Sequence, residues 1–355
     1  MAKTLSNSGY DIKILVWDKS KKSSYLEYYD GIKIINFGFK PIGLGILQLF
    51  SSYFIWMLYI FIYLIKDDSE IIHPENFPAF FPAILPKFFK KNILIYDLAD
   101  FLADSFNWPI LIKNLISIIE KFCLRFADGV VIIGEHRKNQ IAGAKIKRLS
   151  VIFNCPSQKH LYDLVTVQKD DCFLLYYGGL ISESRGLRFI CESVKNFDNI
   201  KMIVAGFGPD EEKFLSLFRE IKNIKFVGFV DSWTSLEFTK RSSLIPALYD
   251  PKIALNKLAS PGKVFDAMMC KTPILINSEA GAVADIVRKE KCGLVIPYGS
   301  KQEIENAITT LITKRELIDE MGNNGYRAFL KEYNWEIMEK RLLNLYDEST
   351  QSKSK

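Results

Sequence analysis

Residues 176–190 read YYGGLISESRGLRFI, and this stretch decides the fold. A short apolar strand ends at Gly178 and Gly179, a polar loop follows, and a helix begins after Arg185 and Gly186. A buried strand that returns through a helix is typical of a parallel sheet covered by helices. Glycines at the end of such a strand let an anionic ligand approach the backbone closely, and Arg185 would lie at the same edge to pair with it.

The same alternation of strand and helix extends in both directions along the chain. Short apolar, β-branched stretches occur at 11–18, 31–37, 70–76, 92–98, 129–134, 172–179, 200–208, 224–230, 243–249, 273–277 and 293–297. Two such α/β sheets in tandem predict two Rossmann-like domains. We expect an N-terminal domain over 1–160 and a C-terminal domain over 170–330. Residues 331–355 are predicted to form a helix that packs back toward the N-terminal domain, followed by a disordered tail.

The start of the chain departs from the usual pattern of such a domain. MAKTLSNSGY is helix-like and runs directly into a strand, whereas a Rossmann domain begins with a strand and a Gly-rich turn. We therefore expect the first strand of the N-terminal domain to be missing. The same ten residues are too polar for a secretory signal.

Composition narrows the class of protein. The chain has 355 residues, of which 48% are hydrophobic and 25% are charged, which is ordinary for a soluble protein of two domains. Its six cysteines have no C-x-x-C spacing, so we interpret them as reduced core thiols of a cytosolic protein and expect no metal site. The net charge of +6 is modest and the basic residues match no known module, which argues against nucleic acid. A G-x-G-x-x-G fingerprint is absent, which argues against a dehydrogenase.

Residues 42–65 form a run of 24 residues without a charge. Such a run alone predicts a transmembrane helix. It lies between two strands of one predicted sheet, however, and a spanning helix would separate them across the bilayer. A crossover helix with one face in the membrane interface fits better, and a fully buried helix is the alternative.

Residues 257–268 read KLASPGKVFDAM and place a turn, a cation and a carboxylate together. Ser260 can cap the helix that follows, Pro261 suits its first turn, and Gly262 leaves room for a ligand. Lys263 adds a positive charge to the free N–H groups there, and Asp266 can accept hydrogen bonds from vicinal hydroxyls. This pattern suits a nucleotide diphosphate, and the alternative is a capped helix with a solvated Lys and Asp. Another strand ends in AGFGPDEEKF (205–214), where Gly206 and Gly208 repeat the glycine-rich turn.

From about residue 172 to 345 the chain resembles a glycosyltransferase of the GT-B fold, retaining family 4. The resemblance is carried by YYGGL and SRGL, VAGFGPDEEK, KFVGFV, PALYDP, SPGKVFDAMMCKTPIL, SEAGAVADIV and CGLVIPYGS, in this order. The first half matches more loosely, through IIHPENFPAFFPAIL, YDLADFLAD and VIFNCPS. The resemblance implies two Rossmann-like domains with a cleft between them. The C-terminal domain would bind a UDP- or GDP-sugar and the N-terminal domain an acceptor, with retention and without a metal or other cofactor.

The resemblance also implies roles for individual residues. Arg185 and Lys263 would hold the diphosphate, with help from the backbone of Ser260, Pro261 and Gly262, and Asp266 would bind the ribose. Two departures stand out. The family usually has two glutamates here, whereas this chain has Asp266 and, eight residues before it, Leu258. Gly179 stands where the family usually has an arginine, so diphosphate stabilisation depends more heavily on Lys263.

The acceptor side is less clearly defined. His73, Glu75 and Asn76 follow one predicted strand, and Asp97 and Asp100 follow the next, at the place of an acidic/His motif whose histidine is absent. Asp100 would contact an acceptor hydroxyl. Asp97 would either do the same or cap a helix, and His73 is equally well explained as a buried structural histidine.

These observations favour a hexosyltransferase of the cytoplasmic membrane face, acting in cell-envelope polysaccharide or other glycan biosynthesis. The apolar run and the basic stretches PKFFKKN (86–92) and AKIKRL (144–149) favour a lipid-linked acceptor over a free glycan. Two alternatives remain open. One is a non-catalytic sugar-nucleotide-binding or scaffold protein. The other is a GT-B nucleotide-sugar epimerase, which would need more histidines than the three present.

Overall fold

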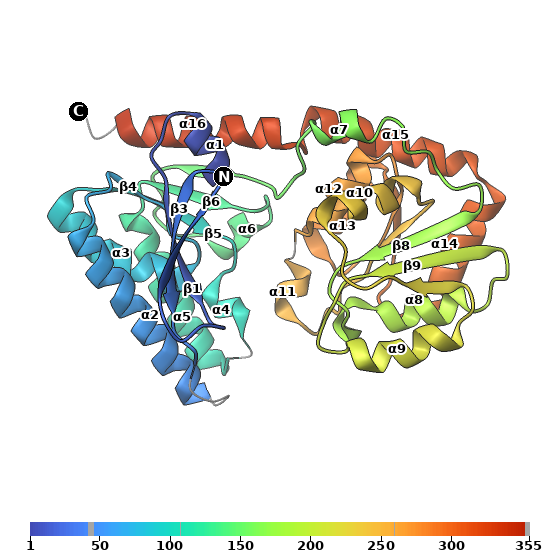
Figure 1. The fold of residues 1–355 in the computed structure, drawn as a ribbon, viewed down its shortest axis with the longest axis horizontal. Coiled ribbons are helices and arrows are strands. Elements are labelled where there is room, and N and C mark those ends of the chain that lie inside the picture. The colour runs from blue at the N-terminus through green and yellow to red at the C-terminus, as the bar shows by residue number, and fades with distance from the viewer. Residues whose placement is uncertain (42–45, 107, 259, 352–355) are drawn as a thin grey trace. The chain divides into compact units, whose positions relative to one another are not determined.

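The computed structural model describes residues 1–41, 46–106, 108–258 and 260–351. The chain divides into two compact units (Figure 1). Unit 1 comprises Met1–Ile133, Arg137–Ile152 and Glu339–Lys355, and unit 2 comprises Gly134–His136 and Phe153–Met338. The last helix, α16 (Trp335–Gln351), therefore begins in unit 2 and ends in unit 1.

Unit 1 contains two small sheets. Its strands are β1 (Lys13–Asp18), β2 (Tyr25–Tyr29), β3 (Ile32–Gly38), β4 (Ile71–Ile72), β5 (Ile93–Leu98), β6 (Gly129–Ile132) and β7 (Leu149–Val151). Its helices are α1 (Ala2–Asn7), α2 (Ile46–Lys66), α3 (Phe77–Lys90), α4 (Leu102–Ser105), α5 (Ile110–Cys123), the 3₁₀ turn η1 (Leu124–Phe126) and α6 (Arg137–Gln140). One sheet has the order β1-β3-β2, and the other is parallel with the order β4-β5-β6-β7.

Two strands of unit 1 differ from the expected pattern. β2 was not expected, and it pairs antiparallel with β3 across a tight turn at Asp30 and Gly31. Both turn residues have positive φ, 49° and 80°, which is the backbone conformation that a two-residue hairpin requires. The predicted strand over 70–76 is regular only at Ile71–Ile72, because Pro74 cannot donate a ladder hydrogen bond and Asn76 has a φ of 63°.

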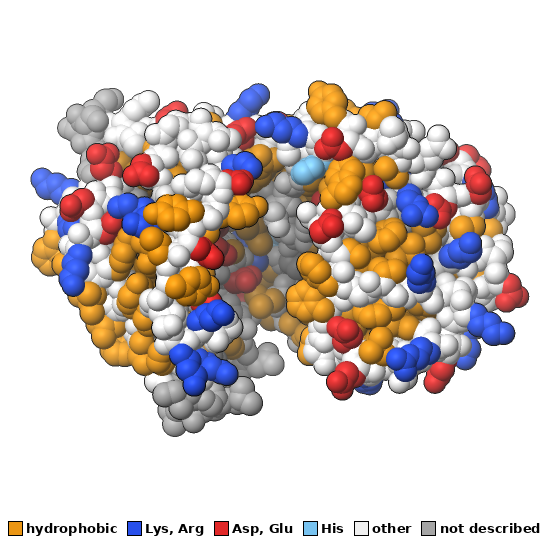
Figure 2. All heavy atoms as spheres, viewed as in Figure 1, with side chains coloured by type: hydrophobic (Ala, Val, Ile, Leu, Met, Phe, Trp, Pro, Cys, Tyr) orange, Lys and Arg blue, Asp and Glu red, His pale blue; other side chains and the backbone are white. Residues whose placement is uncertain are grey.

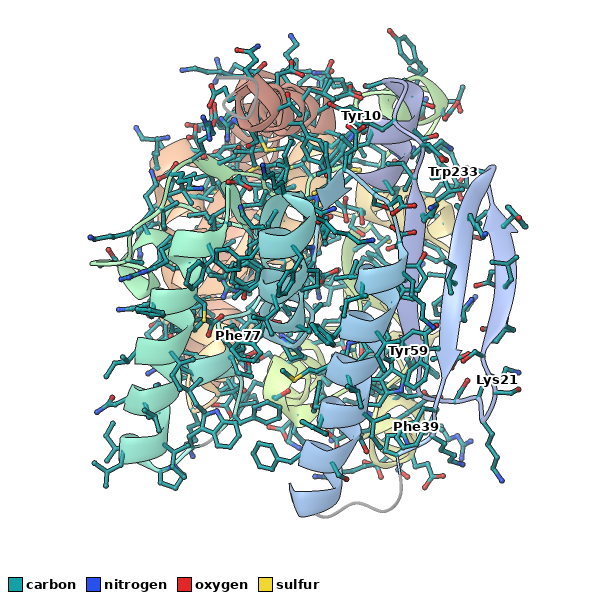
Figure 3. All side chains as sticks on the ribbon, turned by 90° about the vertical axis from the view of Figure 1, so that its left-hand side faces the viewer. Tyr10, Lys21, Phe39, Tyr59, Phe77 and Trp233 are labelled. Atoms are coloured by element: carbon teal, nitrogen blue, oxygen red, sulfur yellow. The ribbon has the colours of Figure 1, made fainter. Side chains whose placement is uncertain are left out.

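Helix α2 packs one side on unit 1 and exposes the other. Trp56 and Ile60 are buried, and Tyr59 stacks on Phe37 of β3 with a centroid distance of 4.1 Å (Figure 3). On the opposite side Phe54 is 65% exposed, and hydrophobic side chains gather along this edge of unit 1 (Figure 2). The fully buried alternative for the apolar run is therefore wrong. Residues 42–45 of that run lie outside the described residues. Among those described, no helix is long and apolar enough to cross a membrane.

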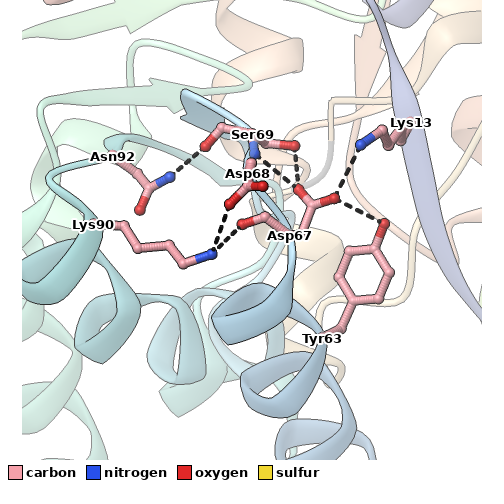
Figure 4. A network of polar contacts seen from close by, with 7 residues as sticks. All are labelled: Lys13, Tyr63, Asp67, Asp68, Ser69, Lys90 and Asn92. Carbon is pink, nitrogen blue, oxygen red and sulfur yellow. Dashed lines mark hydrogen bonds and ion pairs between the residues drawn. The ribbon is translucent and has the colours of Figure 1, made fainter.

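A polar network fixes the end of α2 to its neighbours (Figure 4). Asp67 accepts hydrogen bonds from Lys13 of β1 at 3.0 Å and from Tyr63 at 3.3 Å. Lys90 at the end of α3 donates to the backbone carbonyl of Asp67 at 2.5 Å, and Asn92 donates to the carbonyl of Ser69. The loop that follows α2 is thereby tied to β1, α3 and the start of β5.

Unit 2 has the doubly wound arrangement that the sequence predicts. Its strands are β8 (Phe173–Gly178), β9 (Ile200–Ala205), β10 (Ile224–Phe226), β11 (Ile245–Ala247), β12 (Ile274–Asn277) and β13 (Gly293–Ile296). They form two parallel ladders, β10-β9-β8 and β11-β12-β13, which a parallel bridge between Leu175 and Leu244 joins. The resulting order reverses between β8 and β11, and such a switch point is where ligands bind in open α/β sheets.

The helices of unit 2 cover both faces of this sheet (Figure 1). They are α7 (His160–Asp163), the 3₁₀ turn η2 (Glu183–Arg185), α8 (Leu187–Val194), α9 (Glu211–Glu220), α10 (Ser232–Arg241), α11 (Ala254–Lys257), α12 (Gly262–Met269), α13 (Gly281–Glu290), α14 (Lys301–Thr313) and α15 (Glu316–Lys331). Helices α8, α9 and α14 pack together on one face, and α10, α12 and α15 on the other. The central strands β8, β11 and β12 are buried at every residue except Gly178, so the ends of these strands are the place left for a ligand. All six cysteines are free thiols and five are buried, as predicted.

Candidate functional site

Helix α12 presents its N-terminus at the carboxyl edge of the unit 2 sheet. Gly262 is its first residue, and Pro261 is the N-cap, with a φ of −71° and a ψ of 128°. The prediction that Ser260 caps this helix is therefore wrong. No side chain caps α12, because proline takes the capping position and offers no side-chain acceptor. The hydroxyl of Ser260 is buried without a hydrogen-bond partner among the described residues. The N–H of Val264 donates to the carbonyl of Pro261 at 3.2 Å, and the N–H groups of Gly262 and Lys263 before it are the ones that a ligand can bind.

Lys263 lies in that first turn and reaches back across the end of β8. Its Nζ is 4.4 Å from the centroid of the Tyr177 ring. It also lies against Gly179, where a Cβ atom would come within 3.2 Å of Nζ. Gly179 has a φ of 146°, which residues with a side chain rarely adopt, so the backbone itself favours glycine there. Burial, and then repulsion by Arg185, lower the pKa of Lys263 to about 7.

Arg185, at the end of η2, lies at the same edge. Its Nη1 donates to Oδ1 of Asn256 at 3.3 Å, and its guanidinium lies 5.0 Å from the centroid of the Tyr249 ring. Neither Arg185 nor Lys263 forms an ion pair with a carboxylate in the described part of the chain. Two neighbouring cations, neither of which is in an ion pair among the described residues, form a site that favours a multiply charged anion.

Asp266 lies one helical turn after Lys263. Burial raises the pKa of this carboxyl to about 7, and the charge of Lys263 opposes that rise. The carboxylate is thus a poorly hydrated acceptor beside Lys263, suited to accept hydrogen bonds from a hydroxyl-bearing ligand.

Sequence reasoning missed two residues of this site. Tyr249 is 3% exposed, and its hydroxyl is buried without a hydrogen-bond partner among the described residues. Asn277 at the end of β12 holds the backbone of Tyr249 from both sides, through bonds of 2.7 and 3.1 Å. Both residues follow strands at the carboxyl edge, and that position was the available signal. Tyr249 and Ser260 leave two unsatisfied polar atoms near the cations, as a site that awaits a polar ligand would.

The glycines of the two strand-end loops have different roles. Gly206 has a φ of 136°, and a Cβ atom there would overlap the carbonyl of Gly179, while one at Gly208 would overlap the backbone of Ile181. The loops after β8 and β9 therefore touch backbone to backbone, with Gly179 donating to the Ala205 carbonyl at 3.0 Å. The missing side chains of Gly206 and Gly208 make room for the neighbouring loop, and their contact with a donor stays a prediction. Gly178 faces the phenol of Tyr176, whereas Gly262 has ordinary room beside Asn154.

Gly206→Ala is therefore expected to lower the free energy of unfolding by more than about 3 kcal/mol. It should also displace the loop after β8, since the new methyl group would collide with the backbone carbonyl of Gly179. Gly228→Ala is the matched control: Gly228 also has a positive φ, 72°, but nothing lies within 4 Å of its Cβ position. Urea unfolding of both variants distinguishes the free-energy loss from steric overlap, expected only in Gly206→Ala, from the loss caused by placing a side chain at positive φ. Equal losses in the two variants would contradict the close packing.

In unit 1, the predicted acceptor residues gather at the ends of β4 and β5. His73 Nδ1 lies 2.7 Å from the Tyr346 hydroxyl, and burial lowers the pKa of His73 to about 4, with a smaller contribution from the Met1 amine. His73 is therefore neutral at pH 7. Asn76 accepts the backbone N–H of Asp100 at 2.8 Å through its Oδ1, which braces the loop after β5.

Asp97 is a strand residue and caps no helix. It is the fifth residue of β5 and is 6% exposed, and α4, which follows, has Phe101 as its N-cap. Burial, and next the carboxylate of Glu75, raise the pKa of Asp97 to about 7, and the Met1 amine opposes them. Its Oδ1 is buried without a hydrogen-bond partner among the described residues.

Asp100 pairs with an arginine that sequence reasoning did not identify. Arg137 Nη2 lies 3.2 Å from Asp100, and the arginine side chain is 1% exposed while that of Asp100 is 49% exposed. Arg137 also donates to Gln140 at 3.3 Å. The pair fixes Asp100 at the protein surface of unit 1, with half of its carboxylate accessible.

The sequence is similar to proteins of known function. Residues 165–328 match the family described as "Glycosyl transferases group 1". The phosphatidyl-myo-inositol mannosyltransferase of Mycobacterium leprae is 20% identical over 186 residues, which are 51% of this chain and 48% of that protein. The chitobiosyldiphosphodolichol beta-mannosyltransferase of Candida albicans is 22% identical over 296 residues, which are 71% and 62%. The matches thus span about half to three fifths of these relatives.

Solved structures agree on the fold. Sucrose-phosphate synthase from Thermosynechococcus elongatus superposes with a TM-score of 0.77 at 15% identity, covering 99% of this chain and 92% of that chain. HepE of Anabaena in complex with UDP and glucose gives 0.65 at 16% identity, covering 89% and 86%. The predicted α/β GT-B fold is confirmed.

Proposed function

We propose that this chain, whose residues 165–328 match the glycosyl transferases group 1 family, transfers a sugar from a UDP- or GDP-sugar to a lipid-linked or glycan acceptor. The observation that carries the proposal is the pair Lys263 and Arg185. Lys263 lies in the first turn of α12 and Arg185 is close enough to lower its pKa, and neither cation forms an ion pair among the described residues, so both are available to the leaving diphosphate.

The donor half of the reaction follows from this site. The bond between the anomeric carbon and the phosphate oxygen breaks, and negative charge develops on the departing diphosphate. Lys263, Arg185 and the first N–H groups of α12 stabilise that charge, in a partly buried site where electrostatic interactions are strong. Asp266 accepts hydrogen bonds from the ribose hydroxyls. Gly179 places no side chain against the amine of Lys263, which lies over the ring of Tyr177 on β8. No metal or cofactor takes part, since the two cations perform the task of a metal ion.

The acceptor half uses unit 1. Asp100, held by Arg137, orients the acceptor hydroxyl through its exposed carboxylate oxygen. The acceptor oxygen bonds to the anomeric carbon with retention of configuration, and the hydroxyl proton passes to the departing diphosphate oxygen. Asp97, His73 and Asn76 shape the floor of this region. Asp97 is poised to share a proton, because its raised pKa lies near neutrality.

We further propose that the protein works at the cytoplasmic face of a membrane, in cell-envelope polysaccharide or related glycan biosynthesis. Two observations support a lipid-linked acceptor. The names of both curated relatives contain a lipid, phosphatidyl-myo-inositol and diphosphodolichol. Helix α2 exposes an apolar side to its surroundings.

The test is transfer by the purified chain with UDP- and GDP-sugars, in the presence of EDTA. A radiolabelled sugar is expected to move to a membrane lipid extract, with release of one nucleoside diphosphate per sugar and a rate unchanged by EDTA. Loss of activity in EDTA that Mg²⁺ or Mn²⁺ restores would contradict the metal-independent route. The product's anomeric proton, observed by NMR, distinguishes retention from the beta linkage that one relative's name records. Binding without turnover would indicate a scaffold, and isomerised donor without free diphosphate an epimerase.

The affinity for UDP or GDP should depend on pH through Lys263. Because the pKa of the empty site is about 7, the amine loses its proton above neutrality and the diphosphate then meets one cation fewer. Kd is expected to rise by up to about tenfold per pH unit between pH 7.5 and 9.5, the limit for one linked proton. Isothermal titration calorimetry measures it. Lys263→Arg, which stays charged, should remove the slope, and a slope that persists in this variant would assign it to another group.

A further inference from the structure

The outer surface of unit 1 is apolar over three helices, of which the sequence singled out only one. Helices α2, α3 and α5 lie side by side in Figure 3. We call their outward surface the three-helix face. Its exposed hydrophobic residues are Phe50, Phe54, Leu58, Ile62 and Ile65 of α2, Phe81, Leu85, Phe88 and Phe89 of α3, and Ile110, Leu111, Leu115, Ile118, Ile119 and Phe122 of α5. Leu111 and Phe89 are each 80% exposed. Large apolar patches of this kind on a protein surface mark sites of interaction.

A groove runs between the same helices. It has a volume of about 470 Å³, and its walls include Phe54 and Phe61 of α2, Leu85 of α3 and Phe122 of α5. Phe126 closes one end, in edge contact with Phe88 at 5.6 Å and with Phe122 at 5.8 Å. Every residue that lines the groove is hydrophobic. An occupant therefore needs no polar groups to enter it, and covering it leaves no buried donor or acceptor unsatisfied.

The exposed charges around this face are mostly positive, although Asp68, just after α2, is 99% exposed and lies 3.3 Å from Nζ of Lys90. Helices α2 and α3 contain no Asp or Glu, and the one acid of α5, Glu120, is 0% exposed and accepts hydrogen bonds from Tyr96 and Leu102. Cations stand at the helix ends, with Lys66 after α2, Lys91 after α3 and Arg125 after α5, all exposed. If the same face of a second copy of the chain packed here, positive charges would face positive charges and repel one another. An anionic surface with an apolar interior complements both the charge and the hydrophobicity.

We propose that the three-helix face docks the protein on the surface of an anionic lipid bilayer. The apolar side chains of α2, α3 and α5 enter the headgroup region together, and the cations at the helix ends contact lipid phosphates. This inference deepens the membrane part of the proposed function: it assigns the contact to three helices and selects anionic lipids. It does not depend on which sugar is transferred.

Flotation of the full chain with phosphatidylcholine vesicles, with and without phosphatidylglycerol, tests the proposal. The wild type is expected to bind the anionic vesicles at least about tenfold more tightly, and to lose that preference at high salt. The double variant Leu111→Glu, Ile118→Glu on α5 and the single variant Phe89→Glu on α3 should each lower the partition coefficient by about tenfold or more. Tyr162→Glu, in unit 2, is the matched control at 82% exposure and should bind like the wild type.

Stabilisation by UDP or GDP is measured on the same samples. A variant that keeps this stabilisation but no longer binds vesicles is folded. The assignment of the docking face then stands even if sugar transfer is never observed. Vesicle binding that the α3 and α5 variants leave intact would overturn the assignment. So would a concentration-dependent dimer of the wild type that the same variants dissociate, because the face would then be an interface between copies.

Discussion

Lys263→Met is expected to abolish the stabilisation of the protein by UDP or GDP and to lower the turnover number by about 10²–10³, as the loss of one preorganised charge in an active site does. For the wild type, a nucleotide at a hundredfold excess over Kd raises the free energy of unfolding by about 2.7 kcal/mol. The empty variant should be no less stable than the wild type. In the wild type, the Lys263 amine is desolvated and lies near the positive charge of Arg185, which destabilises the charged form. Methionine fills a similar space and carries no charge to desolvate.

Thermal unfolding with and without nucleotide measures the first effect, and single-turnover kinetics the second. Lys257→Met is the matched control, because Lys257 is an exposed lysine on the neighbouring α11. It should retain nucleotide stabilisation and activity. If Lys263→Met kept the nucleotide shift, the diphosphate would bind elsewhere, and the argument from α12 would fail.

Asp97→Asn is expected to stabilise the protein by about 2–4 kcal/mol at pH 8, because its ionised carboxylate is buried without compensation. The folded-state pKa of about 7 lies above the ordinary value of about 3.8. The folded protein therefore holds more protons than the unfolded chain between these values, so this contribution to stability falls as pH rises through that window. The gain in the variant should vanish below pH 4.

Scanning calorimetry from pH 4 to 8.5 follows the difference between wild type and variant, which cancels the similar contribution of Glu120, whose pKa burial also raises to about 7. Asp68→Asn serves as the control, since that side chain is 99% exposed and should show little change at any pH. A variant that is less stable than the wild type at pH 8 would mean that the carboxylate has a partner there. If Asp97 also serves the acceptor, the stabilised variant should transfer more slowly, which is the usual exchange of stability for function.

Much of the donor half could be predicted from local sequence. The strands of unit 2 were located to within a few residues, because buried parallel strands are short β-branched runs bounded by glycine and proline. Gly179, Lys263 and Arg185 were placed at one edge, because parallel strands end together. The capping role of Ser260 failed by one position, since the choice between adjacent residues depends on backbone angles that many side chains tolerate.

The contribution of each glycine was not predictable. Gly206 and Gly208 occur in a sequence that resembles a ligand-binding turn, yet their missing side chains make room for the neighbouring loop. Arg137 and Tyr249 were not identified from the sequence, for a related reason. Their importance comes from contacts with Asp100 and Arg185, which lie 37 and 64 positions away.

By itself, the sequence determined the class of fold, the order of the strands along the chain and the identity of the charged residues at the donor site. These follow from hydrophobic periodicity and short-range geometry, which act over a few residues. Only the tertiary structure decided which of those charges form no ion pair and which carboxylates are buried. It also showed that α3 and α5 share the exposed apolar surface of α2. Burial and electrostatic environment are properties of packing between distant segments, and the same lysine or phenylalanine is ordinary or functional according to what surrounds it.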